Sequence, residues 1–262
     1  MYMLASAQQG MRMTYRNSLF LLFYSALFAF FSMASVSAWA NVTMTGTRII
    51  YRSDARSVDV NLANQSNFPF VIQSWFDEGN INDGPESKRN IPFVASPASF
   101  RIQAKAGQVV RISHTNSRQL PQDRESVFWF NFQQIPPSNI AGAAAEGQNK
   151  MLVVLRNRVK LFYRPSRLGN PPSNIFPTIK VAPARDGQRS GVVITNTLPF
   201  YLNLGRIQLN ATGVALQATA DMVPPLSSRT FWFNRAAPAG KNTIRLTVIN
   251  DQGARISGDF PL

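Results

Sequence analysis

The chain has 262 residues and a formal net charge of +14, with no cysteine and a single histidine. The lack of cysteine excludes disulfides, thiol nucleophiles and Cys-ligated metal sites, and one histidine cannot supply a His pair for zinc. A basic chain of this size can bind nucleic acid, an anionic membrane surface or an acidic protein. With no cysteine and one histidine, it has few of the side chains that commonly carry out catalysis.

Residues 1–40 have the features of a signal peptide. Two arginines precede the apolar run 19–31, and residues 38–40 (Ala-Trp-Ala) form a small-x-small cleavage site. A membrane anchor is the alternative, but serines interrupt the apolar stretch, which is shorter than the roughly 20 residues that a span needs. We therefore expect an exported protein that begins near Asn41. Such a protein rarely meets nucleic acid.

After residue 40, short segments rich in β-branched and aromatic residues recur between turn-forming residues. The stretch 58–62, Val-Asp-Val-Asn-Leu, alternates between apolar and polar residues and predicts a strand with one buried face. In the first half of the chain we predict strands at 47–51, 58–63, 70–76, 91–94, 100–103, 109–113, 127–132 and 151–163.

The first five residues of this last strand, and the cations that follow them, do not suit an ordinary strand. The stretch 151–155 is apolar throughout, so Met151, Val153 and Leu155 point to one face and the residues between them to the other. A central strand buried on both faces is one explanation. The other is an apolar row that a partner covers.

Three cations then share one face of the same strand, namely Arg156, Arg158 and Lys160. An immunoglobulin-like layout can place Arg48, from an early strand, beside Lys160. Two cations at one cleft can bind a carboxylate through charge-assisted hydrogen bonds, although solvated surface charges are the alternative. An anion anchor followed by an unused apolar row suggests that the strand binds the C-terminus of another polypeptide and pairs with it.

Residues 166–174 (SRLGNPPSN) contain two prolines and no periodicity, which is typical of a linker. About seven strands precede the linker and about seven follow it, the number of one immunoglobulin-like sandwich. We therefore predict an all-β protein with two β-sandwich domains, at 41–165 and 175–262. The strands predicted in the second domain are 178–181, 191–196, 201–209, 214–218, 230–233, 243–249 and 254–260.

Four stretches resemble the periplasmic pilus-assembly chaperones of the chaperone–usher pathway. Residues 120–136 (LPQDRESVFWFNFQQIP) match the family signature almost throughout, with Phe132 in place of a smaller aliphatic residue. TRIIY at 47–51, VKLFYRP at 159–165 and VINDQGARI at 248–256 match further family blocks. The resemblance spans the mature chain and implies two immunoglobulin-like domains in a boomerang arrangement, located in the periplasm.

The resemblance also implies a mechanism without catalysis, nucleotide or other cofactor. Such a chaperone binds, folds and caps pilus subunits by lending them a strand, and delivers them to an outer-membrane usher. Met151, Val153 and Leu155 correspond to the apolar row of this donor strand, and Arg48 and Lys160 to the pair that binds the subunit's terminal carboxylate. Lys160 has the opposite parity from the apolar row, so strand twist or a cleft position must reconcile the two.

Glu125, Arg164 and Asp251 correspond to the family's charge network between the two domains, which orients the domains without touching the subunit. The loop before the donor strand is short and no cysteines bracket it, which indicates the short-loop subclass. An uncovered strand edge predicts that the subunit-free chaperone self-associates. We expect no nucleic-acid, nucleotide or metal ligand.

Two other functions are possible from the sequence. A fimbrial subunit or adhesin is disfavoured because the chain has two full strand sets and no obvious N-terminal donor extension. An exported hydrolase would need His114 as its base, and this residue lies among loop-like polar residues (SHTNSR). Loss of function in a His114→Ala variant would favour the hydrolase, and we expect no such loss.

Overall fold

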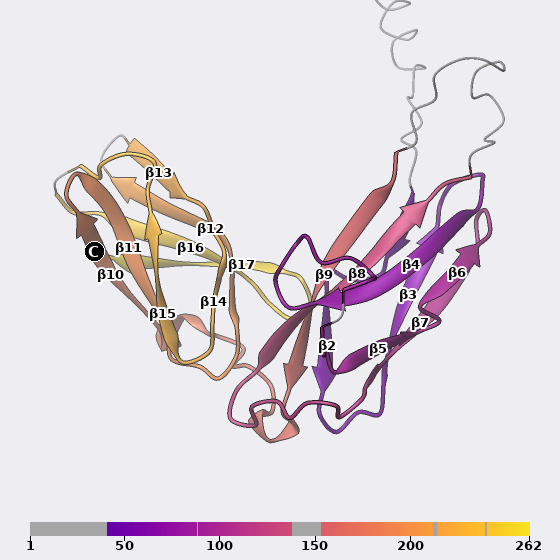
Figure 1. Ribbon diagram of the computed structural model, residues 1–262. Coiled ribbons are helices and arrows are strands. Elements are labelled where there is room, and N and C mark those ends of the chain that lie inside the picture. The colour runs from indigo at the N-terminus through magenta and orange to yellow at the C-terminus, as the bar shows by residue number, and fades with distance from the viewer. Residues whose placement is uncertain (1–40, 88, 138–152, 212–213, 239) are drawn as a thin grey trace, which may run out of the picture. The chain divides into compact units, whose positions relative to one another are not determined.

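The structure is a computed structural model that describes residues 41–87, 89–137, 153–211, 214–238 and 240–262. The expected signal peptide and Met151 lie outside these residues. The described chain consists of strands and two short 3-10 helices, Ser166–Leu168 and Phe176–Thr178 (Figure 1), which confirms the predicted all-β class. None of its helices has the length and apolar character needed to cross a membrane.

The first β-sandwich has one sheet in the order β1-β3-β7-β5 and another in the order β2-β9-β8-β4-β6. All neighbouring strands are antiparallel except β2 and β9, which run parallel. The first sheet contains β1 (Val42–Met44), β3 (Val58–Asn64), β7 (Gly107–His114) and β5 (Phe93–Ser96), and the second contains β2 (Arg48–Arg52), β9 (Leu155–Arg164), β8 (Ser126–Ile135), β4 (Phe70–Asp77) and β6 (Ser99–Ile102).

The inward faces of these two sheets form one hydrophobic core. In β3, Val60 and Leu62 are buried whereas Asp59 and Asn61 are exposed, as the alternating sequence predicts. Phe130 and Phe132 of β8 are also fully buried, so the departure from the family signature at Phe132 is a core substitution. Burying a side chain of this size contributes about 1.5–3 kcal/mol to the free energy of unfolding.

The second β-sandwich has a core of its own, which includes Val192, Ile194, Ile207 and Leu246. One sheet has the order β10-β11-β15 and the other β13-β12-β16-β17, with β14 paired to β12. The strands are β10 (Ile179–Asp186), β11 (Arg189–Asn196), β12 (Leu202–Ala211), β13 (Val214–Ala218), β14 (Met222–Val223), β15 (Ser227–Trp232), β16 (Thr243–Ile249) and β17 (Arg255–Pro261). The protein therefore has two immunoglobulin-like β-sandwiches.

The structure corrects three details of the predicted elements. The short strands β1 and β14 were not predicted, because two or three residues carry no usable periodicity. The strand predicted to begin at residue 151 begins at Leu155, which pairs with Gln134 near the end of β8. After β8 the chain continues with two prolines, which have no backbone N–H to donate to a β-ladder, so the pairing with β9 does not extend further. The predicted linker contains the 3-10 turn Ser166–Leu168.

Candidate functional site

The first half of β9 is an edge strand. On one side β8 pairs with β9 from Leu155 to Tyr163, whereas on the other side β2 pairs only with residues 160–164. Residues 155–159 therefore have an unpaired side in the described part of the chain. The exposed fractions are 60% for Val153 and 41% for Leu155, so the alternative of a strand buried on both faces is wrong at these residues. An exposed apolar edge is a template for pairing with another chain.

The two faces of β9 have different surroundings. Val159, Leu161 and Tyr163 pack against the core of the first sandwich, and Leu155 shares their parity. The even-numbered residues, which include the three cations, lie on the opposite face of the strand. In the structure, as in the sequence, Leu155 of the apolar row and Lys160 therefore lie on opposite faces of the strand.

The structure places Arg48 and Lys160 side by side. They are register partners in the parallel β2–β9 pair, so their side chains leave the sheet on the same face. Lys160 Nζ donates a hydrogen bond to Asn203 Oδ1 at 3.3 Å, and Arg48 Nη1 donates one to the Ile249 carbonyl at 3.1 Å. Both acceptors belong to the second sandwich. Arg48 lies at the first residue of β2, so the pair marks the end of the free edge of β9.

Arg48 and Lys160 lie without a counter-ion in the part of the chain that the structure describes. Neither forms an ion pair with an acidic side chain of the described residues. Arg48 Nε is buried and, within the described chain, has no hydrogen-bond partner. Burial lowers the pKa of Lys160, Arg48 lowers it further and Asp221 opposes the shift. Burial likewise lowers the pKa of Arg48, against Asp251. Two partly buried cations with an unused donor have the chemistry needed to bind an anion.

Glu125, Arg164 and Asp251 form a connected network. Arg164 donates from Nε to Glu125 Oε1 at 2.7 Å and from Nη1 to Asp251 Oδ2 at 2.8 Å, while the Tyr201 amide donates to Glu125 Oε2 at 2.8 Å. Only 3% of the Arg164 and Glu125 side chains is exposed, against 30% for Asp251. Burial lowers the pKa of Arg164, but its bonds to both acids outweigh burial and raise the pKa above its ordinary value. This network links residues of both sandwiches.

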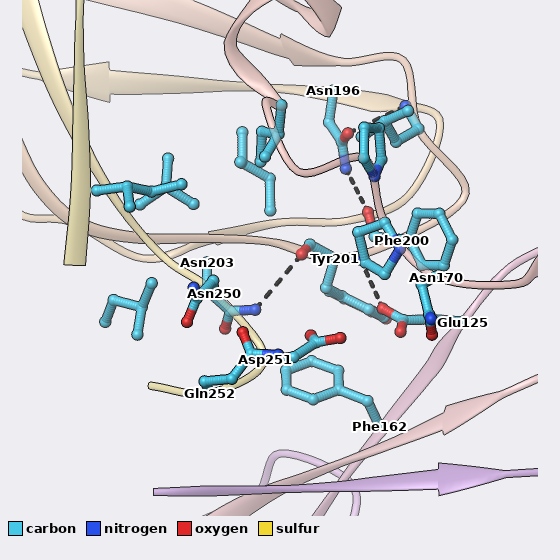
Figure 2. A pocket seen from close by; sticks show the side chains of 18 of the residues that line it. Glu125, Phe162, Asn170, Asn196, Phe200, Tyr201, Asn203, Asn250, Asp251 and Gln252 are labelled. Atoms are coloured by element: carbon cyan, nitrogen blue, oxygen red, sulfur yellow. Dashed lines mark hydrogen bonds between the residues drawn. The ribbon is translucent and has the colours of Figure 1, made fainter. Parts of the chain in front are cut away.

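A cavity of about 440 Å³ lies beside the network. Figure 2 shows Glu125 and Asp251 at its wall together with the rings of Phe162 and Tyr201, whose centroids are 5.7 Å apart. The amide of Asn203 also lines the cavity, but Arg48 and Lys160 do not. The cavity therefore lies next to the Arg48–Lys160 pair and does not include it.

Sequence reasoning missed the partner of the other two cations of β9. Asp77, at the end of β4, is fully buried, and Arg156 and Arg158 both form ion pairs with it. Asn203, which accepts the hydrogen bond of Lys160, was also missed. Two cations on a half-buried strand indicate that an acid lies nearby, because unpaired charges are costly to bury. The sequence does not show which acid that is.

His114 belongs to an aromatic cluster. Its ring centroid lies 5.2 Å from that of Phe93 and 5.1 Å from that of Tyr163, and its Nδ1 shares a hydrogen bond of 2.8 Å with Asn116 Oδ1. These contacts explain the residue as part of the packing at the end of β7. Among the described residues, no group of three acidic, histidine or cysteine side chains could hold a metal ion.

Comparison with known proteins identifies the family. Residues 41–169 match the profile "Pili and flagellar-assembly chaperone, PapD N-terminal domain", and residues 178–260 match "Pili assembly chaperone PapD, C-terminal domain". The probable fimbrial chaperone YadV of Escherichia coli K12 is 37% identical over 229 residues, which cover 87% of this chain and 92% of the relative. The chaperone protein HifB of Haemophilus influenzae is 36% identical over 242 residues, 91% of this chain and 95% of the relative.

A solved structure agrees with this likeness. The crystal structure of the YadV chaperone superimposes with a TM-score of 0.72 at 34% sequence identity, covering 85% of this chain and 100% of that one. The likeness therefore includes both sandwiches, and the chain belongs to the PapD family of pilus-assembly chaperones.

Proposed function

We propose that the protein is a periplasmic chaperone that binds, folds and caps fimbrial subunits by donor-strand complementation and delivers them to an outer-membrane usher. One observation carries the proposal. The free edge of β9, residues 155–159, begins at the exposed apolar Leu155 and leads directly to Arg48 and Lys160, which form no ion pair with an acid of the described residues.

The geometry suggests how the subunit is held. Its terminal carboxylate binds Lys160 Nζ and the Arg48 guanidinium, supplying an anion to two partly buried cations that form no ion pair among the described residues. Its last strand then occupies the edge of β9, with its C-terminus where β2 begins at Arg48. A chain that ends at this point and extends toward Leu155 runs parallel to β9, as β2 does. The carboxylate fixes the register, since a slip of one residue would turn every side chain to the wrong face.

The donor residues are Met151, Val153 and Leu155, of which the first lies outside the described residues. The exposure of Val153 and Leu155 leaves them available to fill an apolar groove in the subunit. By alternation, Val153 and Leu155 point to the opposite face of β9 from Lys160. This is compatible with the role, because a subunit strand that pairs with the edge of β9 can be reached by side chains from either face of β9. Main-chain hydrogen bonds supply affinity and the apolar row supplies specificity.

Other parts of the proposal rest on the family and on sequence features. Residues 1–40 direct export, the two domains comprise 41–165 and 175–262, and the network of Glu125, Arg164 and Asp251 fixes their mutual orientation. Family membership supports the usher as a second partner, and the free edge of β9 supports self-association without a subunit. The mechanism includes no catalytic step.

Co-expression with candidate fimbrial subunits, followed by pull-down from the periplasm, tests the proposal. Lys160→Ala should abolish subunit capture, whereas Lys180→Ala, at an exposed lysine of β10, should capture the subunit like the unmodified protein. Undiminished capture by Lys160→Ala would remove the anchor from the mechanism.

A further inference from the structure

Two cations of β9 outside the anion site converge on a single buried carboxylate. Asp77 Oδ1 accepts hydrogen bonds from the Gly79 amide at 2.7 Å and from Arg158 Nη2. Asp77 Oδ2 accepts from Arg158 Nε at 2.9 Å and from Asn131 Nδ2 at 2.8 Å, with Arg156 Nη2 at 3.4 Å. Arg156 Nε also donates to Asn131 Oδ1 at 3.0 Å. We call Asp77, Asn131, Arg156 and Arg158 the Asp77 cluster.

Two tryptophans restrict the guanidinium groups of this cluster. Arg158 lies 4.4 Å from the ring centroid of Trp129, and Arg156 lies 4.8 Å from that of Trp75. Arg156 Nη1 donates a further hydrogen bond to the Ile81 carbonyl at 2.6 Å, which ties the loop after β4 to β9. Only 26% of the Arg156 side chain and 21% of the Arg158 side chain is exposed. Both arginines are therefore held in single positions.

The register of the sheet places the cluster across the free half of β9. Asn131 of β8 lies opposite Arg158 of β9, and Asp77 of β4 lies opposite Trp129 of β8. The cluster thus links β4, β8 and β9, and it holds β9 at residues 156 and 158. These residues belong to the stretch that, in the described chain, has no strand on its other side. A strand paired on one side frays more readily than a central one, and the cluster opposes this fraying.

We propose that Asp77 is a positioning residue for the donor strand: through Arg156 and Arg158 it keeps residues 155–159 extended and in register before a subunit arrives. The inference rests on the proposed function. If β9 is already ordered in the free chaperone, subunit binding does not have to include the entropy cost of ordering it. Asp77 can therefore strengthen binding without contacting the subunit. Burial raises the pKa of Asp77, but the bonds from Arg158, Asn131 and Gly79 outweigh it, so the carboxyl stays ionised.

Hydrogen exchange of the subunit-free chaperone tests this role. In Asp77→Asn and in Arg156→Lys, we expect protection of the β9 amides that bond to β8 within residues 155–159 to fall by about tenfold. Arg156→Lys keeps the charge but cannot reach its three acceptors together, and Arg158 still neutralises Asp77. It therefore decides the question even if Asp77→Asn does not fold. Ile194→Val is the control, because it weakens the second sandwich and should leave exchange in β9 unchanged.

Binding of the subunit captured in the co-expression experiment gives the second readout. Both cluster variants should bind it about tenfold more weakly, a difference of about 1.4 kcal/mol. Lys160→Ala should lose binding yet keep normal exchange in β9, so failure of the anchor and failure of the positioning role are separable. Normal exchange in β9 in a folded Arg156→Lys variant would overturn the inference. Altered exchange with unchanged subunit affinity would overturn it as well.

Discussion

Removal of single members of the Glu125–Arg164–Asp251 network should lower stability in a defined order. Asp251→Ala deletes one charge-assisted hydrogen bond of 2.8 Å from a side chain that is 30% exposed. Such bonds contribute about 1.5–3 kcal/mol, and partial exposure reduces the expected loss to about 1–2 kcal/mol. Arg164→Ala instead leaves Glu125 buried without its cation, which costs about 3–5 kcal/mol.

Urea unfolding followed by tryptophan fluorescence measures these losses as changes in the free energy of unfolding. Asp259→Ala is the matched control, because it removes a solvent-exposed ion pair with Arg245 and should lower the free energy of unfolding far less than Asp251→Ala does. At a temperature where Asp251→Ala remains folded, we expect it to capture the subunit as the unmodified chaperone does. A variant of Asp251 with normal stability and no subunit binding would refute the structural role of the network.

Three further outcomes follow from the site. Leu155→Ser should weaken subunit capture while changing the unfolding free energy by at most about 0.5 kcal/mol, since the side chain is exposed; a loss of stability without a loss of capture would contradict its donor role. Because burial lowers the pKa of Lys160 and carboxylate binding needs the charged ammonium, subunit affinity should be complete below that pKa and decline above it, at a pH below the ordinary lysine value. A pH titration of binding measures this decline, and Lys160→Arg should remove it. His114→Ala should retain subunit capture in the pull-down, whereas a loss of capture in a folded protein would contradict its purely structural role.

The sequence predicted the fold class because strand patterns are local. The alternation at 58–62 predicts which face of β3 is buried, and the structure agrees. Strands of two or three residues have no such pattern, and the start of β9 depends on where its partner β8 ends. An immunoglobulin-like layout suggested Arg48 and Lys160 as a pair, and the resemblance to the family then gave the pair its expected role. Their roles in binding remain predictions.

The features that escaped prediction depend on contacts far apart in the chain. Asp77 meets Arg158 across 81 residues, and Asn203 meets Lys160 across 43 residues. A charged residue on a partly buried strand indicates that an oppositely charged partner is nearby. The sequence contains several acids that could form ion pairs with the cations of β9. The pairing follows only from the order of strands in the sheet, in which β8 lies between β4 and β9.

A crystal structure of the chaperone with its subunit is the most direct measurement. We predict that the subunit's terminal carboxylate lies within hydrogen-bond distance of Lys160 Nζ and the Arg48 guanidinium, and that its last strand runs parallel to β9 along residues 155–159. A terminal carboxylate bound elsewhere, or an edge of β9 left unpaired in the complex, would contradict the mechanism.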